Sequence, residues 1–341
     1  MIEERDLDAA VTAGILDAAT RERLVVFART HRQGAAGPDE EQFRLLTGFN
    51  DIFVTIAIGL LLFAVGSLGG AITPVLGAIG VAAASWGLAE YFTRQRRMAL
   101  PSIALLLTFV SAVFATVLSA TTGSASFAAA NGASIGLIAA AAVAVGAAVL
   151  HWRRFNVPIT AAAGAAALVG TITAAIAFVH GSSDLILLTL FICGLAVFAL
   201  AMWFDTRDRA RVTRRTDVAF WLHLLAAPLI VHPVFKLAEL LQPDAEAGAA
   251  VAVIAVYAAL TLIALAIDRR ALLVSALFYV IYAIQALVTA GDSGIAASFG
   301  ITALVIGLFL VLLSAAWRPI RARVLAFLPG SMSVRLPVAA V

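Results

Sequence analysis

The sequence predicts an all-α fold: a polytopic membrane helix bundle of about ten transmembrane helices, with both chain ends in the cytoplasm. Composition, long charge-free runs and the placement of arginines support this. Of 341 residues, 62% are hydrophobic and 13% are charged, and the mean hydropathy is +1.02. Ordinary soluble domains carry about a quarter charged residues. The composition therefore excludes a typical water-soluble chain and indicates surroundings that are mostly lipid.

Charge-free runs define the expected spans, because a bilayer core of about 30 Å needs about 20 apolar residues per helix. The runs Ile52–Ala89 and Met98–Leu150 are each long enough for two helices, and the first is expected to turn at Gly69-Gly70. The remaining spans are single helices at Phe155–Val179, Leu185–Phe204, Val218–Phe235, Ala247–Ile267, Ala271–Gly291 and Ser293–Trp317.

Arginine placement orients these spans. The chain has 23 basic residues, and all of them except Lys236 are arginines that fall in segments on one side of the expected ten crossings. Basic residues in short loops stay cytoplasmic, which predicts that both ends of the chain are inside. Met1–Asn50 has no basic start followed by an apolar core, so we expect no cleavable signal peptide. The bias to arginine and alanine indicates a bacterial source, and the expected location is the bacterial inner (cytoplasmic) membrane.

Three regions are expected along the chain. Residues 1–48 form a cytosolic N-terminal helical region, residues 49–317 form the transmembrane bundle, and residues 318–341 form a cytosolic C-terminal tail. At the inner end of the second span, Glu90 lies one turn before Arg94 and is expected to pair with it at the interface.

The N-terminal region is expected to be a small helical hairpin. A first helix covers Arg5–Ala13 and ends at Gly14, and a second is capped by Asp17 and runs to about His31. Its apolar stripe is Leu24, Val25, Phe27 and Ala28. Such a hairpin buries too little surface to be very stable alone. It is either a packed cap without its own activity or a docking module for another protein.

A family resemblance rests on several short motifs. The motif Ala13-Gly14-Ile15-Leu16-Asp17 precedes an amphipathic helix, a linker and many apolar spans. The turns between those spans include Arg94–Arg97, Trp152-Arg153-Arg154, Asp268-Arg269-Arg270 and Trp317-Arg318-Pro319. The chain resembles an uncharacterised family of bacterial multi-pass membrane proteins with an N-terminal cytosolic helical region. The resemblance implies the same membrane architecture and no particular activity.

Small residues predict which helices are central. The fourth and fifth spans are dominated by alanine, and Gly132 and Gly136 have the GxxxG spacing that lets helix backbones approach closely. We therefore expect these two helices at the centre of the bundle. Gly66 and Gly70 repeat the spacing at the first hairpin, where it serves either packing within the chain or formation of a homo-oligomer.

The seventh span carries unusual polar residues for a membrane helix. The candidate intramembrane polar site is His223, His232, Lys236 and Glu239, and the candidate helix break is Pro228 and Pro233. An interior proline leaves a backbone carbonyl without its usual donor, which predicts a kinked or broken helix with His223 near mid-depth. Ionisable groups within a span are functional candidates by default. Alternatively, Pro233 begins a short interfacial helix in which Lys236 and Glu239 meet water.

Several motifs of soluble enzymes are absent from the sequence, which contains no Walker A loop, HExxH or CxxC. We therefore predict no enzymatic activity, no cofactor and no nucleic-acid partner. His180 and Asp184 lie on the same predicted side as His232 and Glu239, but their spacing does not require a metal, and no metal site is expected.

Two functions lead from the sequence, ahead of an intramembrane enzyme acting on lipid, which only scattered His, Asp and Glu residues favour. The first is secondary transport of a small molecule or ion, favoured by the short loops and the proline-interrupted helix with titratable groups. The second is a non-transporting membrane scaffold or sensor that binds a protein partner through the N-terminal helical region. The lipid bilayer is the partner common to both.

Overall fold

The computed structural model describes residues 4–35, 49–122, 134–208, 213–237, 247–270, 273–274, 276–277, 279–281, 284 and 295–329. Within these ranges the regular structure is helical and contains no strand. The chain divides into two compact units, of which the first contains α1 and α2 and the second contains α3 to α13. The expected all-α class is confirmed for the described residues.

The first unit is a helical hairpin of α1 (Glu4–Thr12) and α2 (Ala18–Ala35). Gly14 ends the first helix with a φ of 69°, in the left-handed region that glycine adopts without strain. Asp17 caps the second helix, because its carboxylate accepts the backbone N–H of Thr20 at 2.6 Å. Both end signals that the sequence predicted are confirmed.

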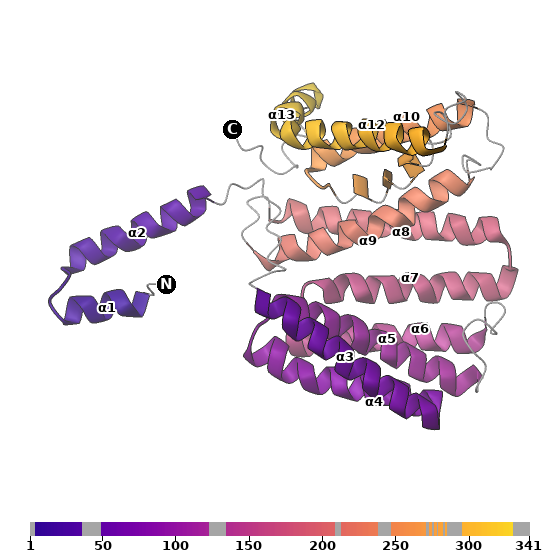
Figure 1. Ribbon diagram of the computed structural model, residues 1–341, viewed down its shortest axis with the longest axis horizontal. Coiled ribbons are helices and arrows are strands. Elements are labelled where there is room, and N and C mark those ends of the chain that lie inside the picture. The colour runs from indigo at the N-terminus through magenta and orange to yellow at the C-terminus, as the bar shows by residue number, and fades with distance from the viewer. Residues whose placement is uncertain are drawn as a thin grey trace. The chain divides into compact units, whose positions relative to one another are not determined.

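Seven helices of the second unit are long and apolar enough to cross a membrane. They are α3 (Phe49–Ile72), α4 (Pro74–Ala89) with its π-helical continuation η1 (Glu90–Gln95), α5 (Ala99–Thr122), α6 (Ile135–Phe155), α7 (Ile159–His180), α8 (Ser183–Thr206) and α9 (Arg214–Leu237). The protein is therefore a multi-pass membrane protein. Figure 1 shows these helices lying side by side, with consecutive helices as neighbours.

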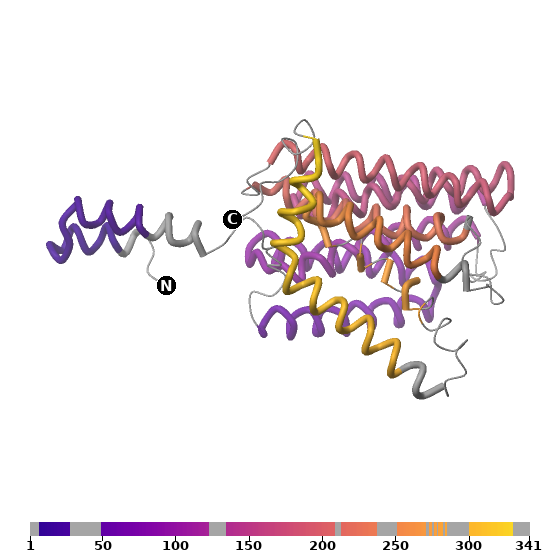
Figure 2. Tube along the Cα trace, turned by 90° about the horizontal axis from the view of Figure 1, so that it is seen from above, coloured from indigo at the N-terminus to yellow at the C-terminus, as the bar shows by residue number. Residues whose placement is uncertain are grey.

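Three further helices of this unit have bounds within the described residues. The apolar helix α10 (Ala247–Ile267) is followed, after a gap in the described residues, by α12 (Ile295–Ala315) and α13 (Trp317–Phe327). The axes of α12 and α13 differ by 73°, and the two together add an eighth span if they are counted as one bent crossing. The predicted span Ala271–Gly291 lies largely outside the described residues. Figure 2 shows α13 running across the other helices rather than along them.

The outward faces of the bundle are apolar, as expected for contact with lipid. Along α3, for example, Leu60 is 67% exposed and Phe63 is 74% exposed. In water such a continuous apolar face would promote aggregation, whereas lipid tails solvate it well.

The first turn of the bundle differs from the prediction. Helix α3 continues through Gly69-Gly70 to Ile72, and the chain turns at Thr73, whose side chain caps α4 ahead of Pro74. The two helices approach so closely here that a Cβ at Gly77 would lie 2.7 Å from the carbonyl oxygen of Gly66. These glycines therefore serve helix packing, and the turn is made by a capping threonine and a proline.

The helix that lies most deeply in the bundle is also not the one expected. Half of the apolar stretch of α9 is buried (50%), compared with 28% for α6 and 17% for α7, the fourth and fifth spans. Small residues let helices approach closely, but burial depends on how many neighbours a helix has. Helix α9 packs on α7 and α8, and its residue Phe235 lies in a core cluster with Val253 of α10. Of the predicted GxxxG pair, Gly132 lies outside the described residues.

Candidate functional site

A buried ionic network joins three segments of the second unit. Asp205, in the last turn of α8, accepts hydrogen bonds from Nε2 of His223 at 2.9 Å and from Nη2 and Nε of Arg269 at 2.5 and 3.2 Å. The three residues are 2%, 0% and 1% exposed. We call these three residues the Asp205 network. It brings a carboxylate, an imidazole and a guanidinium together inside a membrane protein.

Local structure places each of these side chains. Asp205 ends the apolar helix α8, and His223 lies on the face of α9 that packs against it. Arg269 lies two residues after the end of α10. Between them Asp268 adopts a left-handed φ of 57°, and the N–H of Arg269 returns to the carbonyl of Ala264. This C-terminal motif reverses the chain and turns the Arg269 side chain back toward α8.

The network is balanced electrostatically. Burying one unpaired charge in a medium of low dielectric constant is expensive, whereas a two-point pair of guanidinium and carboxylate satisfies both partners. His223 adds a third hydrogen bond to the Asp205 carboxylate, in which Nε2 donates. One carboxylate therefore links α8, α9 and the turn after α10 at this end.

A second polar turn lies next to the network. Asp208 accepts from the backbone N–H and hydroxyl of Thr213 at 2.9 and 2.6 Å, and from the hydroxyl of Thr216 at 2.8 Å. Nη2 of Arg269 in turn contacts the carbonyl of Thr216 at 3.5 Å. The start of α9 is thus fixed both to the end of α8 and to the arginine after α10.

A parallel contact holds α13. Nε1 of Trp317 donates to Asp268 at 2.8 Å, and Nε of Arg321 lies 3.7 Å from the same carboxylate oxygen. Arg270 covers the Trp317 ring, 4.8 Å from its centroid. Asp268 and Arg269 are adjacent, so one short turn links the Asp205 network to α13.

The predicted polar residues of α9 are only partly brought together. The structure pairs His223 with Asp205, while Nδ1 of His232 lies 2.6 Å from the hydroxyl of Tyr279, at a separate place. Lys236 is exposed, and Glu239 lies outside the described residues. The four predicted residues therefore do not form one cluster among the residues that the structure describes.

The predicted break at Pro228 and Pro233 is not observed, and the kink, the other form predicted, stays a prediction. Helix α9 runs from Arg214 to Leu237 without interruption and includes both Pro228 and Pro233. The helix packs closely on α8 along this uninterrupted path. Pro233 is buried within this helix, so it does not begin a separate interfacial helix. His223, predicted near mid-depth, instead meets the last turn of α8, at the end of the bundle where the arginines gather.

The first half of the bundle has its own ion pair. Glu90 accepts from Arg94 at 3.2 Å, as predicted, and from Nε of Arg154 at 2.6 Å. Arg154 belongs to α6, so this pair also joins separate helices. Nearby, His151 is fully buried and packs on Phe155 with ring centroids 4.6 Å apart.

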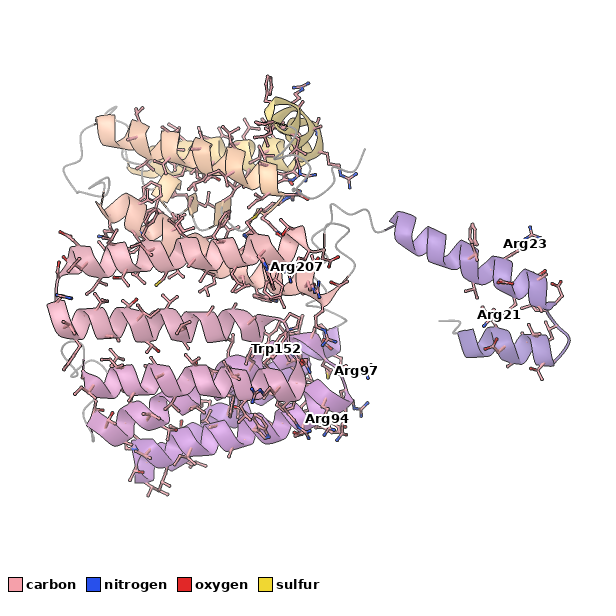
Figure 3. All side chains as sticks on the ribbon, turned by 180° about the vertical axis from the view of Figure 1, so that it is seen from behind. Arg21, Arg23, Arg94, Arg97, Trp152 and Arg207 are labelled. Carbon is pink, nitrogen blue, oxygen red and sulfur yellow. The ribbon has the colours of Figure 1, made fainter. Side chains whose placement is uncertain are left out.

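Arginines gather at one end of the bundle. Figure 3 labels Arg94 and Arg97, from the connection between α4 and α5, and Arg207, from the end of α8, on the same side, with Trp152 on that side as well. The Asp205 network lies next to Arg207 at this end. The guanidinium of Arg207 itself lies 3.8 Å from the centroid of the Trp203 ring.

Metal binding has no structural support in the parts of the chain that the structure describes, where no group of three or more His, Cys, Asp or Glu residues could hold an ion. The Asp205 network offers one carboxylate to two donors, an imidazole and a guanidinium. Histidine is the side chain that most readily changes charge near neutral pH, and here it shares its carboxylate with a permanent cation.

Comparison of the chain with protein-family models, with curated proteins and with solved structures found no match.

Proposed function

We propose that this protein is a proton-coupled secondary transporter of a small molecule or ion, with the Asp205 network as its coupling site. The observation that carries the proposal is the sharing of one buried carboxylate between His223 and Arg269. Ionisable groups inside membrane proteins are expensive to bury and usually mark ion pathways or proton relays. A purely structural link between three helices needs no titratable imidazole.

The proposed coupling step depends on the charge of His223, which lies on the same carboxylate as Arg269. With His223 neutral, the carboxylate of Asp205 balances Arg269, and the three helices are held together at the arginine-bearing end. A proton on His223 adds a second positive charge beside Arg269, and both cations then compete for one carboxylate. The Arg269 contact weakens, which loosens α10 from α8 and opens that end.

The finer architecture is part of the proposal. We infer ten crossings with both termini in the cytoplasm, a bacterial inner-membrane location and membership in the family that the sequence resembles. The shared side of Arg94, Arg97 and Arg207 supports this orientation, because basic residues stay on the cytoplasmic side. The expected segments 1–48 and 49–317 are kept as the proposed organisation. The segment 318–341 is kept on the cytoplasmic side, but its first part is α13, which packs on the bundle. No enzymatic activity is proposed.

The test uses the full chain in liposomes that enclose a pH-sensitive dye. A panel of small organic cations, amino acids and sugars is added outside, and proton movement is recorded for each compound. We expect at least one compound to drive proton movement with the wild-type protein. If no compound does so, the transport proposal is wrong.

Two variants assign the coupling site. His223→Gln keeps a hydrogen-bond donor for Asp205 but does not accept a proton, so we expect a folded protein whose substrate-driven proton movement is lost. Glu90→Gln is the matched control, because it changes an ion pair between helices elsewhere in the bundle and should leave the movement intact. Unchanged proton movement in His223→Gln would remove this histidine from the mechanism.

A second candidate function is favoured by the N-terminal hairpin. The hairpin is a compact unit of its own, and Ile15 and Phe27 on it are 77% and 61% exposed. Exposed apolar side chains on a small helical unit fit a scaffold or sensor that binds a protein partner. Deletion of residues 1–38 separates the two functions, because transport should survive the deletion and partner binding should not.

A further inference from the structure

We propose that α13 is an interfacial helix that lies in the headgroup layer and binds anionic phospholipid at the arginine-bearing end of the bundle. The proposal does not depend on transport. It rests on the direction, the length and the two faces of this helix.

The direction of α13 differs from that of the spans. Its axis is turned by 73° from α12, and Figure 2 shows it crossing the bundle near the end where the arginines gather. A helix that runs across membrane-spanning helices lies close to the plane of the bilayer. An interfacial helix takes this direction.

The length and charge of α13 argue against a crossing. It contains 11 residues, about half of what a span requires. Arg318 and Arg323 are both exposed, which would place two guanidinium groups in hydrocarbon if α13 continued the path of α12. Reading α12 and α13 as one broken span therefore leaves these two charges without a suitable solvent.

The inward face of α13 is anchored to the bundle. Ile320, Val324 and Leu325 pack on the core cluster that contains Tyr257 and Leu265 of α10. Trp317 and Arg321, both buried, contact Asp268 at the end of α10. These contacts fix the depth of α13 and leave its opposite face outward.

The outward face combines cations with an apolar residue. Arg318 and Arg323 flank a surface of small exposed residues, and Phe327 is 91% exposed at the end of the helix. Guanidinium groups recognise phosphate oxygens, and the apolar side chains of an interfacial helix are buried at the boundary between headgroups and acyl chains. Anionic lipid supplies both the phosphate and the apolar layer, which is why it fits this face better than a soluble anion.

The experiment places an environment-sensitive fluorophore on the full chain in vesicles. The only natural cysteine is removed by Cys193→Ser, and the label is attached to Phe327→Cys. We expect blue-shifted emission that is quenched by lipids with a spin label near the headgroup. A label at Val305→Cys, an exposed position within α12, is the matched control and should be quenched best by a spin label deep in the acyl chain.

Changing the lipid composition tests whether Arg318 and Arg323 bind anionic headgroups. Raising the share of phosphatidylglycerol in phosphatidylcholine vesicles should increase quenching at position 327, and Arg318→Gln with Arg323→Gln should remove this dependence. If the label at 327 has water-like emission that lipid does not quench, α13 faces the aqueous phase and the proposal is wrong. If the double variant keeps the full dependence on phosphatidylglycerol, the arginines do not bind the anionic headgroup and the assigned partner is wrong.

Discussion

Asp205 and Arg269 are 64 residues apart in the sequence and meet as a two-point ion pair that solvent does not reach. The pair joins the last turn of α8 to the turn after α10, and His223 of α9 completes it. Each ion alone would be expensive to bury, so each makes the burial of the other tolerable. The pair therefore acts as one unit, and its members should not be exchangeable one at a time.

Removal of one partner of this pair should strongly destabilise the protein. In Asp205→Asn the guanidinium of Arg269 stays buried without a balancing charge, and loss of one member of a buried pair typically costs about 3–5 kcal/mol. The free energy of unfolding, measured by denaturant titration in mixed micelles, should fall by an amount in this range.

A double variant shows whether the loss comes from the unpaired charge. Asp205→Asn combined with Arg269→Met removes both charges, and it should be less destabilised than the sum of the two single variants. If the two losses simply add, the residues do not stabilise each other and the ion pair is not a unit.

Glu90 offers a more exposed pair for comparison. It accepts from Arg154 of α6 and Arg94, but its side chain is 30% exposed and water competes for the same groups. Glu90→Gln should therefore reduce the free energy of unfolding by much less than Asp205→Asn in the same titration. A loss as large as that of Asp205→Asn would mean that Glu90 is effectively shielded from water.

Hydropathy and capping rules predicted the helices well because these features are local. Every described helix that is long enough to span coincides with a predicted apolar stretch, and Gly14 and Asp17 end and begin helices as expected. The turn at Gly69-Gly70 was misplaced because glycine also serves close helix packing. Sequence alone does not separate these two uses.

The Asp205 network was missed for a definite reason. Spans were delimited by the absence of charge, and Asp205 and Arg269 come directly after such stretches, so both were treated as loop residues at the interface. Their burial depends on how α8, α9 and α10 pack, which is a long-range property. One signal was present: His223 within an apolar span needs a polar partner, and Asp205 is an acid on the same predicted side.

Acid should weaken the start of α2. The backbone N–H and the hydroxyl of Thr20 hold the pKa of Asp17 below its ordinary value of 3.8. A lowered carboxyl pKa in the folded state means that the cap stabilises the helix above pH 3.8 and loses this effect as the pH falls through the lowered value. Hydrogen exchange of the first turn of α2, followed by mass spectrometry of the full chain, should show this loss of protection.

Variants of Asp17 identify the source of the effect. Asp17→Ala should show fast exchange in this turn already at neutral pH, whereas Asp17→Asn should keep the cap and lose its dependence on acid. Protection that is equal in all three proteins would show that the Asp17 side chain does not stabilise α2.

The approach of α3 to α4 gives a prediction with a control in the same helix. A Cβ at Gly77 would lie 2.7 Å from both the carbonyl oxygen of Gly66 and the backbone nitrogen of Gly70. Backbone atoms do not rotate aside, so Gly77→Ala must push the helices apart, and such overpacking costs about 1–3 kcal/mol. At Gly87, also in α4, a Cβ meets nothing within 4 Å, so Gly87→Ala should be neutral or stabilising because alanine favours helix. The free energies of unfolding of the two variants, measured by denaturant titration, should therefore change in opposite directions or by clearly different amounts. Equal changes in the free energy of unfolding would mean that α3 and α4 do not pack at this distance.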